Sequence, residues 1–388
     1  MSRETMSSRQ RVLAALNHQI PDRVPIDLGG NQTGIHKFAF QAVAELLGID
    51  STVVIMDAVQ QLAKPSELLL ERFHVDTRYI AAGAAADFKG GIVQRRRNGQ
   101  LWHDLTDEFG ITWSMPDDQP FYMDISHHPL ASATIKDIRD YPFPKGDDLG
   151  RFVGLRQRAL EIRQQTPYAV VSGISGVVYE ICWYLRGLET WFMDMLTQPE
   201  FCEVLIDHTL KFWMDWFRVF LDEVGDVVDV IMIGDDLAAQ KGPLFRPEFY
   251  RRVVKPRHKQ LVQYIRSRTK AKIWYHTCGA CVEYIPDLLD NGIDILNPVQ
   301  ISASGMEPAG LKARFGNRLT FWGGAIDTQH VLPRASAETV REEVRRNMDI
   351  WKPGGGYVFN NVHNIQAGVP PENIVALYDA AYDFGFYG

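Results

Sequence analysis

A regular alternation of apolar runs and helical segments, beginning near residue 150, constrains the fold more than any other feature of this sequence. The apolar runs are short and rich in β-branched and aromatic residues, and they span 168–173, 227–233, 272–275, 293–296, 319–322 and 357–359. Segments with helical spacing separate them, for example 199–224 and 247–268. Strands that are buried on both faces and joined by helices pair in parallel. So many consecutive units favour a closed (β/α)8 barrel, or TIM barrel, over an open doubly wound sheet.

The first 150 residues add two features to this pattern. Residues 8–16 have the spacing of an amphipathic helix, and the apolar run 24–28 is typical of a first barrel strand. Within residues 75–124, short strand patterns surround the turn sequence Asn98-Gly99, which indicates a β-hairpin. We therefore predict an α/β fold in which residues 1–388 form a single barrel domain. An N-terminal helical segment precedes the barrel, and residues 75–124 form a small antiparallel β excursion.

Charge and cysteine content exclude several classes of function. The formal net charge is −7, which argues against binding to nucleic acids or anionic membranes. The four cysteines lack the spacing of a disulfide framework, and the sequence shows no signal peptide and no long apolar span. We therefore expect a soluble protein in the reducing cytoplasm, so any special role of a cysteine would be chemical.

His276 and Cys278 form the first candidate metal site. They follow a short strand pattern and come just before Gly279, and side chains two positions apart on a strand point to the same side. An imidazole nitrogen and a thiolate sulfur suit zinc, whereas calcium and magnesium prefer oxygen ligands. The alternative is that both residues are ordinary core residues at the end of a strand.

Polar, ligand-capable residues follow each of the later strand patterns. They are Asp235, Asp236, His276, Cys278, Asn297, Gln300, Asp327, His363 and Gln366. In a parallel barrel the carboxyl ends of all strands lie on one face, which is the face that holds active sites. These residues therefore predict a single site, although an aspartate at such a position can also cap the next helix.

A competing motif overlaps the first one. Cys278 and Cys281 form a C-x-x-C pair between a strand and a helix, as dithiol redox centres do. The long barrel pattern does not support an oxidoreductase of that kind. A reversible disulfide between these two cysteines would be required for it.

Several segments together resemble the uroporphyrinogen decarboxylase family in the broad sense. They are Arg11-Val-Leu-Ala-Ala-Leu-Asn-His18, Asp22-Arg-Val-Pro25, Tyr184-Leu-Arg-Gly-Leu-Glu189, Gly234-Asp-Asp236, His276-Thr-Cys-Gly279, Asn297-Pro-Val-Gln300 and Pro370-Pro-Glu-Asn-Ile374. The family includes true decarboxylases and zinc-containing, corrinoid-linked methyltransferases similar to methylcobalamin:coenzyme M methyltransferase. The resemblance implies a (β/α)8 barrel with its site at the carboxyl ends of the strands.

The same resemblance separates the two branches. Decarboxylases of the family carry an arginine-rich segment after the first strand, and here residues 28–34 contain no arginine. The methyltransferases bind zinc through His-x-Cys and a distant third cysteine, and the first two fall on His276 and Cys278. The position of the third cysteine is occupied by His363, which is competent to bind zinc. His363 would instead contact substrate if it corresponds to the late histidine of the decarboxylases.

We therefore expect a zinc-dependent methyltransferase that acts with a corrinoid, either free or on a separate protein, and on a small methyl donor or thiol acceptor. The resemblance implies that His276, Cys278 and His363 bind zinc, with Asp235 or Glu180 as a possible fourth ligand. The expected catalytic residues are Asp235 and Asp327. Residues expected to contact substrate are Tyr179, Asp236, Tyr275, Asn297, Gln300, Trp322 and Gln366. The alternatives are uroporphyrinogen decarboxylation and a non-catalytic barrel that binds a tetrapyrrole or a corrinoid protein.

Overall fold

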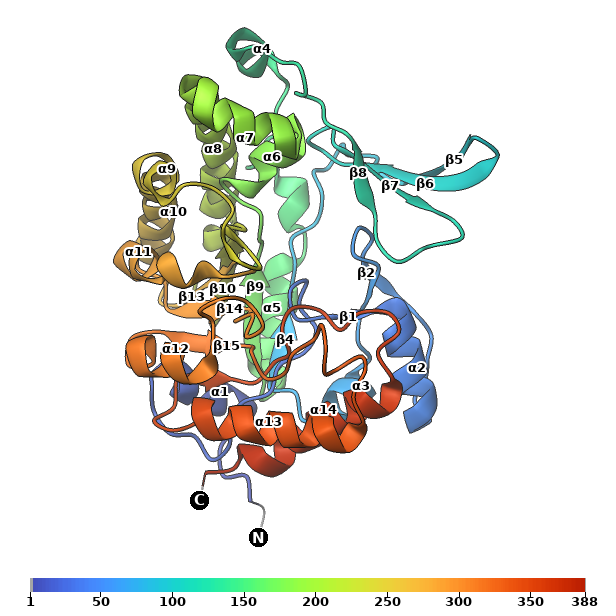
Figure 1. Ribbon diagram of the computed structural model, residues 1–388, viewed down its shortest axis with the longest axis vertical. Coiled ribbons are helices and arrows are strands. Elements are labelled where there is room, and N and C mark those ends of the chain that lie inside the picture. The colour runs from blue at the N-terminus through green and yellow to red at the C-terminus, as the bar shows by residue number, and fades with distance from the viewer. Residues whose placement is uncertain (1–2, 388) are drawn as a thin grey trace.

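The computed structural model describes residues 3–387, and a seven-stranded parallel sheet lies at its centre (Figure 1). The neighbouring strands follow in the order β16 (Tyr357–Val358), β15 (Thr320–Trp322), β14 (Ile295–Asn297), β13 (Lys272–His276), β10 (Val230–Gly234), β9 (Ala169–Gly173) and β4 (Thr77–Tyr79). Every pairing within this sheet is parallel. The predicted α/β barrel architecture is confirmed.

The segment predicted as the first strand lies between the two edges of this sheet. Ile26 forms a parallel bridge with Phe359, and the N–H of Asp27 donates to the Phe359 carbonyl over 2.9 Å. On its other side, the carbonyl of Ile26 accepts from the N–H of Asp76 over 2.8 Å. The segment is too irregular to be a full strand, but its hydrogen bonds on both sides join β16 to β4 and close the barrel.

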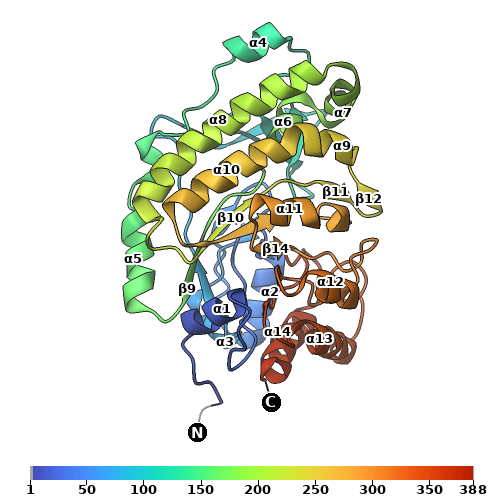
Figure 2. The same ribbon diagram turned by 90° about the vertical axis from the view of Figure 1, so that its left-hand side faces the viewer.

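Helices pack around the barrel, and most of them cover its outside (Figure 2). They are α1 (Ser8–Leu16), α2 (Lys37–Leu47), α3 (Glu67–Arg72), α4 (Ile135–Asp140), α5 (Leu155–Gln165), α6 (Glu180–Arg186), α7 (Leu188–Thr197), α8 (Pro199–Val224), α9 (Pro247–Phe249), α10 (Lys255–Arg268), α11 (Ile285–Asn291), α12 (Pro308–Phe315), α13 (Ala337–Trp351) and α14 (Pro371–Gly385). α6 and α7 are two separate helices, because Gly187 with φ +91° lies between them. Within residues 3–387, no helix has both the length and the apolar character needed to cross a membrane.

An antiparallel sheet projects from the barrel between β4 and α4 (Figure 1). Its strands are β5 (Ile92–Arg97), β6 (Gln100–Thr106), β7 (Thr112–Pro116) and β8 (Asp124–His127). Asn98 and Gly99 join the first two strands with φ of +49° and +82°, as a tight hairpin requires. The boundaries 75–124 were therefore too early, because β4 within that range pairs with β9 as a barrel strand.

Two separate apolar cores hold the barrel together. One core fills the inside of the barrel, where Trp274 and Trp322 pack at a tilt with ring centroids 4.6 Å apart and α1 contributes Val12 and Leu16. The other, larger core lies between the sheet and the helices and includes Tyr275. Along β13, Trp274 therefore faces inward and Tyr275 outward. His276 points inward again, because side chains alternate along a strand.

Candidate metal centre

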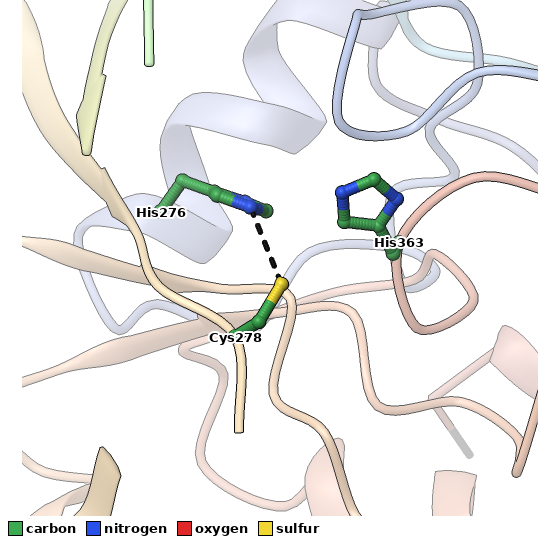
Figure 3. Close-up of side chains that lie close together, drawn as sticks. All are labelled: His276, Cys278 and His363. Carbon is green, nitrogen blue, oxygen red and sulfur yellow. Dashed lines mark hydrogen bonds between the residues drawn. The ribbon is translucent and has the colours of Figure 1, made fainter. Parts of the chain in front are cut away.

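Two histidines and one cysteine lie together at the carboxyl ends of the strands (Figure 3). His276 is the last residue of β13, Cys278 follows it in the next loop, and His363 lies in the loop after β16. Their candidate ligand atoms all lie within 4.8 Å of one another. We call these three residues the trio. The parallel barrel brings them together from distant parts of the chain.

Gly234 makes room for His276. The two residues are partners in the register of β10 and β13. A Cβ atom at position 234 would lie only 2.4 Å from the carbonyl oxygen of His276 and 2.7 Å from its Cβ atom. A glycine at the end of β10 is therefore needed for the backbone of His276 to pack against it.

Asn297 fixes the orientation of the His276 ring. Asn297 Nδ2 donates to the carbonyl of Trp322 over 2.9 Å, so Oδ1 of this amide faces His276. Oδ1 lies 2.6 Å from His276 Nδ1, which must therefore carry the proton and donate it. Nε2 keeps its lone pair and lies 3.6 Å from Cys278 Sγ. This is the tautomer that a metal-binding histidine needs.

Burial sets the protonation of the trio. It lowers the pKa of His276 to about 4. Burial also lowers the pKa of His363 to about 3; repulsion from His276 adds to this shift and the Asp236 carboxylate opposes it. For Cys278, burial raises the thiol pKa well above its ordinary value, and the Asp236 carboxylate raises it further. Near neutral pH both rings are thus neutral ligands, and the thiol holds a proton that a metal would displace.

The loop that carries His363 is held in an uncommon backbone conformation. His363 has φ +61°, and Asn361 Nδ2 donates to its carbonyl oxygen over 2.6 Å. Asn364 joins the loop to the segment after the first strand, because its Oδ1 accepts from the N–H of Gly34 over 2.6 Å and its Nδ2 donates to the Asn31 carbonyl over 2.8 Å. A non-glycine residue with positive φ costs about 1 kcal/mol or more, and such strain is concentrated at functional sites.

Two buried carboxylates adjoin the trio. Asp236 Oδ1 accepts from the N–H of Cys278 over 2.7 Å, and the N–H of Asp236 donates to Glu180 Oε2 over 3.1 Å. The hydroxyl of Tyr184 donates to Glu180 Oε1. Burial and the charge of Asp236 raise the pKa of Glu180, and burial raises the pKa of Asp236. Both residues are therefore positioned to hold a proton or to offer an oxygen near Cys278.

Asp235 and Asp327, the two predicted catalytic residues, have carboxylates that are engaged by other parts of the structure. Asp235 accepts from three successive backbone N–H groups at the start of α6 and from His258 Nε2 over 2.7 Å. Asp327 accepts from His330 Nδ1 over 2.9 Å and from two N–H groups of its own loop. The structure does not bring either carboxylate into the trio, so their catalytic role stays a prediction.

Three aromatic residues expected to contact substrate are fully buried. Tyr179, Tyr275 and Trp322 are each 0% exposed. Tyr179 packs on Phe245 with ring centroids 4.5 Å apart, and Trp322 packs against Trp274 inside the barrel. These rings are core residues rather than an open lining, because bulky apolar side chains gain more by packing than by exposure.

The predicted polar contacts lie around the trio at different depths. Asn297 and Asp236 contact it directly, as described above. Gln300 Oε1 accepts from the N–H of Gly279 over 2.8 Å and so holds the loop that carries Cys278. Gln366 is exposed, and its Nε2 donates to the Asn364 carbonyl over 3.2 Å.

Sequence reasoning missed Tyr184, His258 and Asp27. Tyr184 lies four positions after Glu180, and this spacing places both on one face of a helix. Asp27 is a carboxylate within the apolar run 24–28, and it accepts from Trp322 Nε1 over 2.9 Å and from the Tyr79 hydroxyl over 3.0 Å. His258 lies in α10 and gave no signal, because only the fold places it beside Asp235.

The trio offers two imidazole nitrogens and one sulfur, a donor set that suits zinc. Three protein ligands leave one position for a substrate, as in catalytic zinc sites. The fixed tautomer of His276 supplies the required lone pair, and its second nitrogen has the acceptor that zinc-binding histidines usually have. The residues present therefore fit a zinc ion.

Comparisons with known proteins identify a family that this chain resembles. The sequence profile of the uroporphyrinogen decarboxylase (URO-D) family matches residues 105–384. A uroporphyrinogen decarboxylase from Alkalilimnicola ehrlichii is 24% identical over 270 residues, which are 66% of this chain and 67% of that protein. Another, from Thioalkalivibrio sulfidiphilus, is 35% identical over 74 residues, or 19% of this chain and 20% of that protein.

Among solved structures, a methyltransferase from Methanosarcina mazei has the same fold. The TM-score is 0.65 at 18% sequence identity, over 98% of this chain and 99% of that one. The family profile spans most of the chain, including every strand from β9 to β16 and all three residues of the trio. The chain therefore belongs to the uroporphyrinogen decarboxylase (URO-D) family.

Proposed function

We propose that the protein is a zinc-dependent methyltransferase that moves a methyl group between a corrinoid and a small methyl donor or thiol acceptor. The observation that carries the proposal is the trio, whose ligand atoms lie within 4.8 Å of one another with His276 held in the metal-binding tautomer. The methyltransferase fold of the structural neighbour supports it. The absence of arginine from residues 28–34 supports it against a substrate with several carboxylates.

Each residue of the site has a distinct role in this proposal. Zinc held by the trio would lower the pKa of a bound thiol or polarise a bound methyl donor. His276 and His363 enter as neutral ligands, and Cys278 contributes the one negative charge. Asn297 keeps the His276 ring in position through its 2.6 Å hydrogen bond. The Asp236 carboxylate, which holds the N–H of Cys278, would take up the proton that a thiol releases on binding.

The corrinoid enters this proposal as a partner, either free or on a separate protein. It would approach the carboxyl-end face of the barrel, where the trio lies. A small corrinoid-binding protein encoded beside this chain would identify that partner. Purified together with this chain, the partner protein should accelerate methyl transfer above the rate seen with free methylcobalamin.

Metal analysis and a methyl-transfer assay test the proposal. The purified protein should contain about one zinc ion per chain and should demethylate methylcobalamin in the presence of a thiol. Cys278→Ser removes the only thiolate of the trio, so zinc content and turnover should both fall by more than about a hundredfold, since loss even of outer partners costs 10–100-fold. The fold should survive, because a barrel of this size has its own core.

Cys281→Ser is the matched control for this test. Cys281 lies three positions away and is also buried, but its sulfur contacts Met306 at 3.9 Å. This variant should keep zinc and activity, whereas a redox function of the C-x-x-C pair would be lost in both variants. His363→Cys should retain zinc. A protein that turns over fully after chelation would exclude the zinc mechanism.

Uroporphyrinogen decarboxylation is the second candidate, because the two curated relatives carry that name. It would require basic side chains for the substrate carboxylates from outside residues 28–34. Conversion of uroporphyrinogen to coproporphyrinogen by the purified protein at a catalytic rate would favour this candidate over methyl transfer.

A further inference from the structure

A cavity of about 1290 Å³ opens between the barrel and the antiparallel sheet. The backbone after β9, from Gly173 to Gly176, forms part of its wall, so the cavity reaches the carboxyl-end face of the barrel. Ten aromatic side chains also line it, and six of them form what we call the aromatic wall: Phe109, Trp113, Tyr184, Phe212, Trp213 and Trp216. Pockets of roughly 300–1,000 Å³ already hold drug-sized ligands. This cavity is therefore larger than a small thiol or a methylated amine needs.

Contacts between these aromatic rings fix the shape of the cavity wall. Trp113 from the antiparallel sheet and Tyr184 from α6 meet edge to face, with ring centroids 5.3 Å apart. Phe109 and Phe212 meet in the same way at 4.9 Å. Trp113 is also held by the hydrogen bond of 2.9 Å from its Nε1 to Asp107. A flat aromatic ligand would find preformed ring faces and edges here.

The arginines of the cavity wall already have partners. Arg151 donates to Glu108 over 2.9 Å, and Arg78 pairs with Glu67. Arg158 donates to backbone carbonyl oxygens over 3.1 Å and 3.2 Å. The lysine of the lining, Lys64, is exposed to solvent. A carboxylate or sulfonate in the aromatic part would therefore lose its hydration without gaining a buried cation, which is costly.

A short chain of hydrogen bonds joins this cavity to the trio. Tyr184 lines the cavity, and its hydroxyl donates to Glu180 Oε1. Glu180 Oε2 accepts from the N–H of Asp236 over 3.1 Å. Asp236 Oδ1 in turn accepts from the N–H of Cys278 over 2.7 Å. A ligand in the cavity would thus lie next to the side chains that adjoin the metal centre.

We infer that the cavity binds the methyl donor and that this donor is a bulky aromatic molecule without a negative charge. This inference rests on the proposed function and names the substrate class of the same site. The size of the cavity argues against a small donor, the paired arginines argue against an anionic one, and the ring contacts favour an aromatic one. The donor would present its methyl group towards Tyr184 and the trio.

Binding measurements with three probes of different charge test the inference. Methoxybenzene is neutral and aromatic, tetramethylammonium is a cation, and 2-mercaptoethanesulfonate is an anionic thiol. Methoxybenzene should quench the tryptophan fluorescence of the intact protein saturably, and should bind at least tenfold more tightly than either other probe. Equal or tighter binding of one of those two, or no saturable binding of methoxybenzene, would overturn the inference.

Two matched tryptophan variants locate the probe. Trp113→Leu removes a ring of the cavity wall and should weaken methoxybenzene binding by roughly tenfold, the size of an aromatic pair plus its buried area. Trp102→Leu changes a ring on the neighbouring strand β6, where Trp102 packs against Arg97, and should leave the affinity unchanged. Equal affinities in the two variants would place the probe elsewhere. Circular dichroism of both variants checks that the antiparallel sheet is folded.

A third comparison separates this inference from the proposed function. Binding is measured again with the chelated protein and with His363→Ala, which lacks one residue of the trio. Methoxybenzene should bind both within about twofold of the intact protein, because the aromatic wall does not include the trio. If the purified protein binds methoxybenzene but contains no zinc and transfers no methyl group, the proposed function is refuted and the cavity assignment is retained. Methyl transfer by a protein that does not bind methoxybenzene would support the proposed function and refute the cavity assignment.

Discussion

The two ends of the barrel differ in the ionisable groups that they bury. At the amino ends of the strands, Asp76 accepts from Arg11 Nη1 over 2.6 Å and from Arg23 Nη1 over 2.7 Å. Arg11 also donates to Asp22 over 2.7 Å. Burial raises the pKa of Asp22, but hydrogen bonds from Arg11 and from the N–H groups of Met6 and Thr5, together with the Arg11 charge, hold it well below its ordinary value. Opposite charges thus meet at this end, and α1 is tied to β4.

At the carboxyl ends of the strands, two histidines lie close together, and so do two carboxylic acids. The rings of His276 and His363 lie 5.3 Å apart, and repulsion from His276 adds to the burial that lowers the pKa of His363. Burial and the charge of Asp236 raise the pKa of Glu180. An arrangement of this kind costs stability and is typical of functional sites. The amino end therefore stabilises the fold, and the carboxyl end gathers the candidate ligands and the carboxylates that the proposed function uses.

The substitution with the largest expected effect is at the amino ends of the strands, and it changes the free energy of unfolding. Asp76→Asn leaves the buried guanidinium groups of Arg11 and Arg23 without their shared carboxylate, so the free energy of unfolding should fall by about 3 kcal/mol. Urea denaturation measures it. Asp379→Asn is the control, because its partner Arg72 is 38% exposed and such a pair contributes less than about 1 kcal/mol. Equal losses would mean that burial does not distinguish the two ion pairs.

The next largest expected effect is a loss of zinc affinity at the candidate metal centre, not a loss of stability. Asn297→Leu removes the acceptor of His276 Nδ1, so the ring is free to rotate and zinc affinity should fall by about 10–100-fold. Competition with a chromophoric chelator measures this affinity. Asn373→Leu changes another buried asparagine, which donates to the Leu332 carbonyl over 2.8 Å, and should leave zinc affinity intact. A similar loss in both variants would show only general destabilisation.

The pH dependence of zinc binding sharpens the same contrast. The thiol of Cys278 has a raised pKa, mainly because it is buried, so zinc must displace its proton. The pKa values of about 4 for His276 and about 3 for His363 mean that neither ring competes for protons near neutrality. Zinc affinity should therefore rise about tenfold per pH unit between roughly pH 5 and 8. A flat profile would indicate that Cys278 is not a ligand.

The smallest effect is a gain in stability at the carboxyl end. Burial and Asp236 raise the pKa of Glu180 in the folded state, so the wild type loses stability as pH rises from the unfolded value towards the folded one. Glu180→Gln removes this loss and should raise the free energy of unfolding at pH 8 by about 1 kcal/mol, with no gain near pH 4. Glu161→Gln, on the exposed face of α5, should show no such difference. A loss of stability in Glu180→Gln would mean that its hydrogen bonds outweigh the repulsion.

Local sequence pattern was enough to predict the barrel and the proximity of two residues of the candidate site. Period-two alternation predicted that His276 and Cys278 emerge together, and their 3.6 Å contact depends only on neighbouring residues of one strand end. The turn at Asn98 and Gly99 is local in the same sense. Boundaries were less predictable, because the break at Gly187 and the place of β4 depend on packing against other elements.

The roles of particular polar residues could not be predicted in this way. Asp235 and Asp236 are adjacent in sequence and chemically identical, yet one accepts the N–H groups of α6 and the other holds Cys278. Which role each receives depends on the register of β10 against β13, because a shift of one residue would exchange their faces. Likewise, Tyr179 and Tyr275 became core residues because the helix layer covers them.

The sequence by itself determined the class of fold, the pairing of an imidazole and a thiol at His276 and Cys278, and the absence of arginine from residues 28–34. These properties follow from side-chain chemistry and short-range periodicity. Only the tertiary structure decided that His363 completes the trio, that Asn297 fixes the His276 tautomer, and that Tyr184 joins an aromatic cavity to it. Each of these contacts joins different elements, and their distances are set by how the barrel closes rather than by any segment alone.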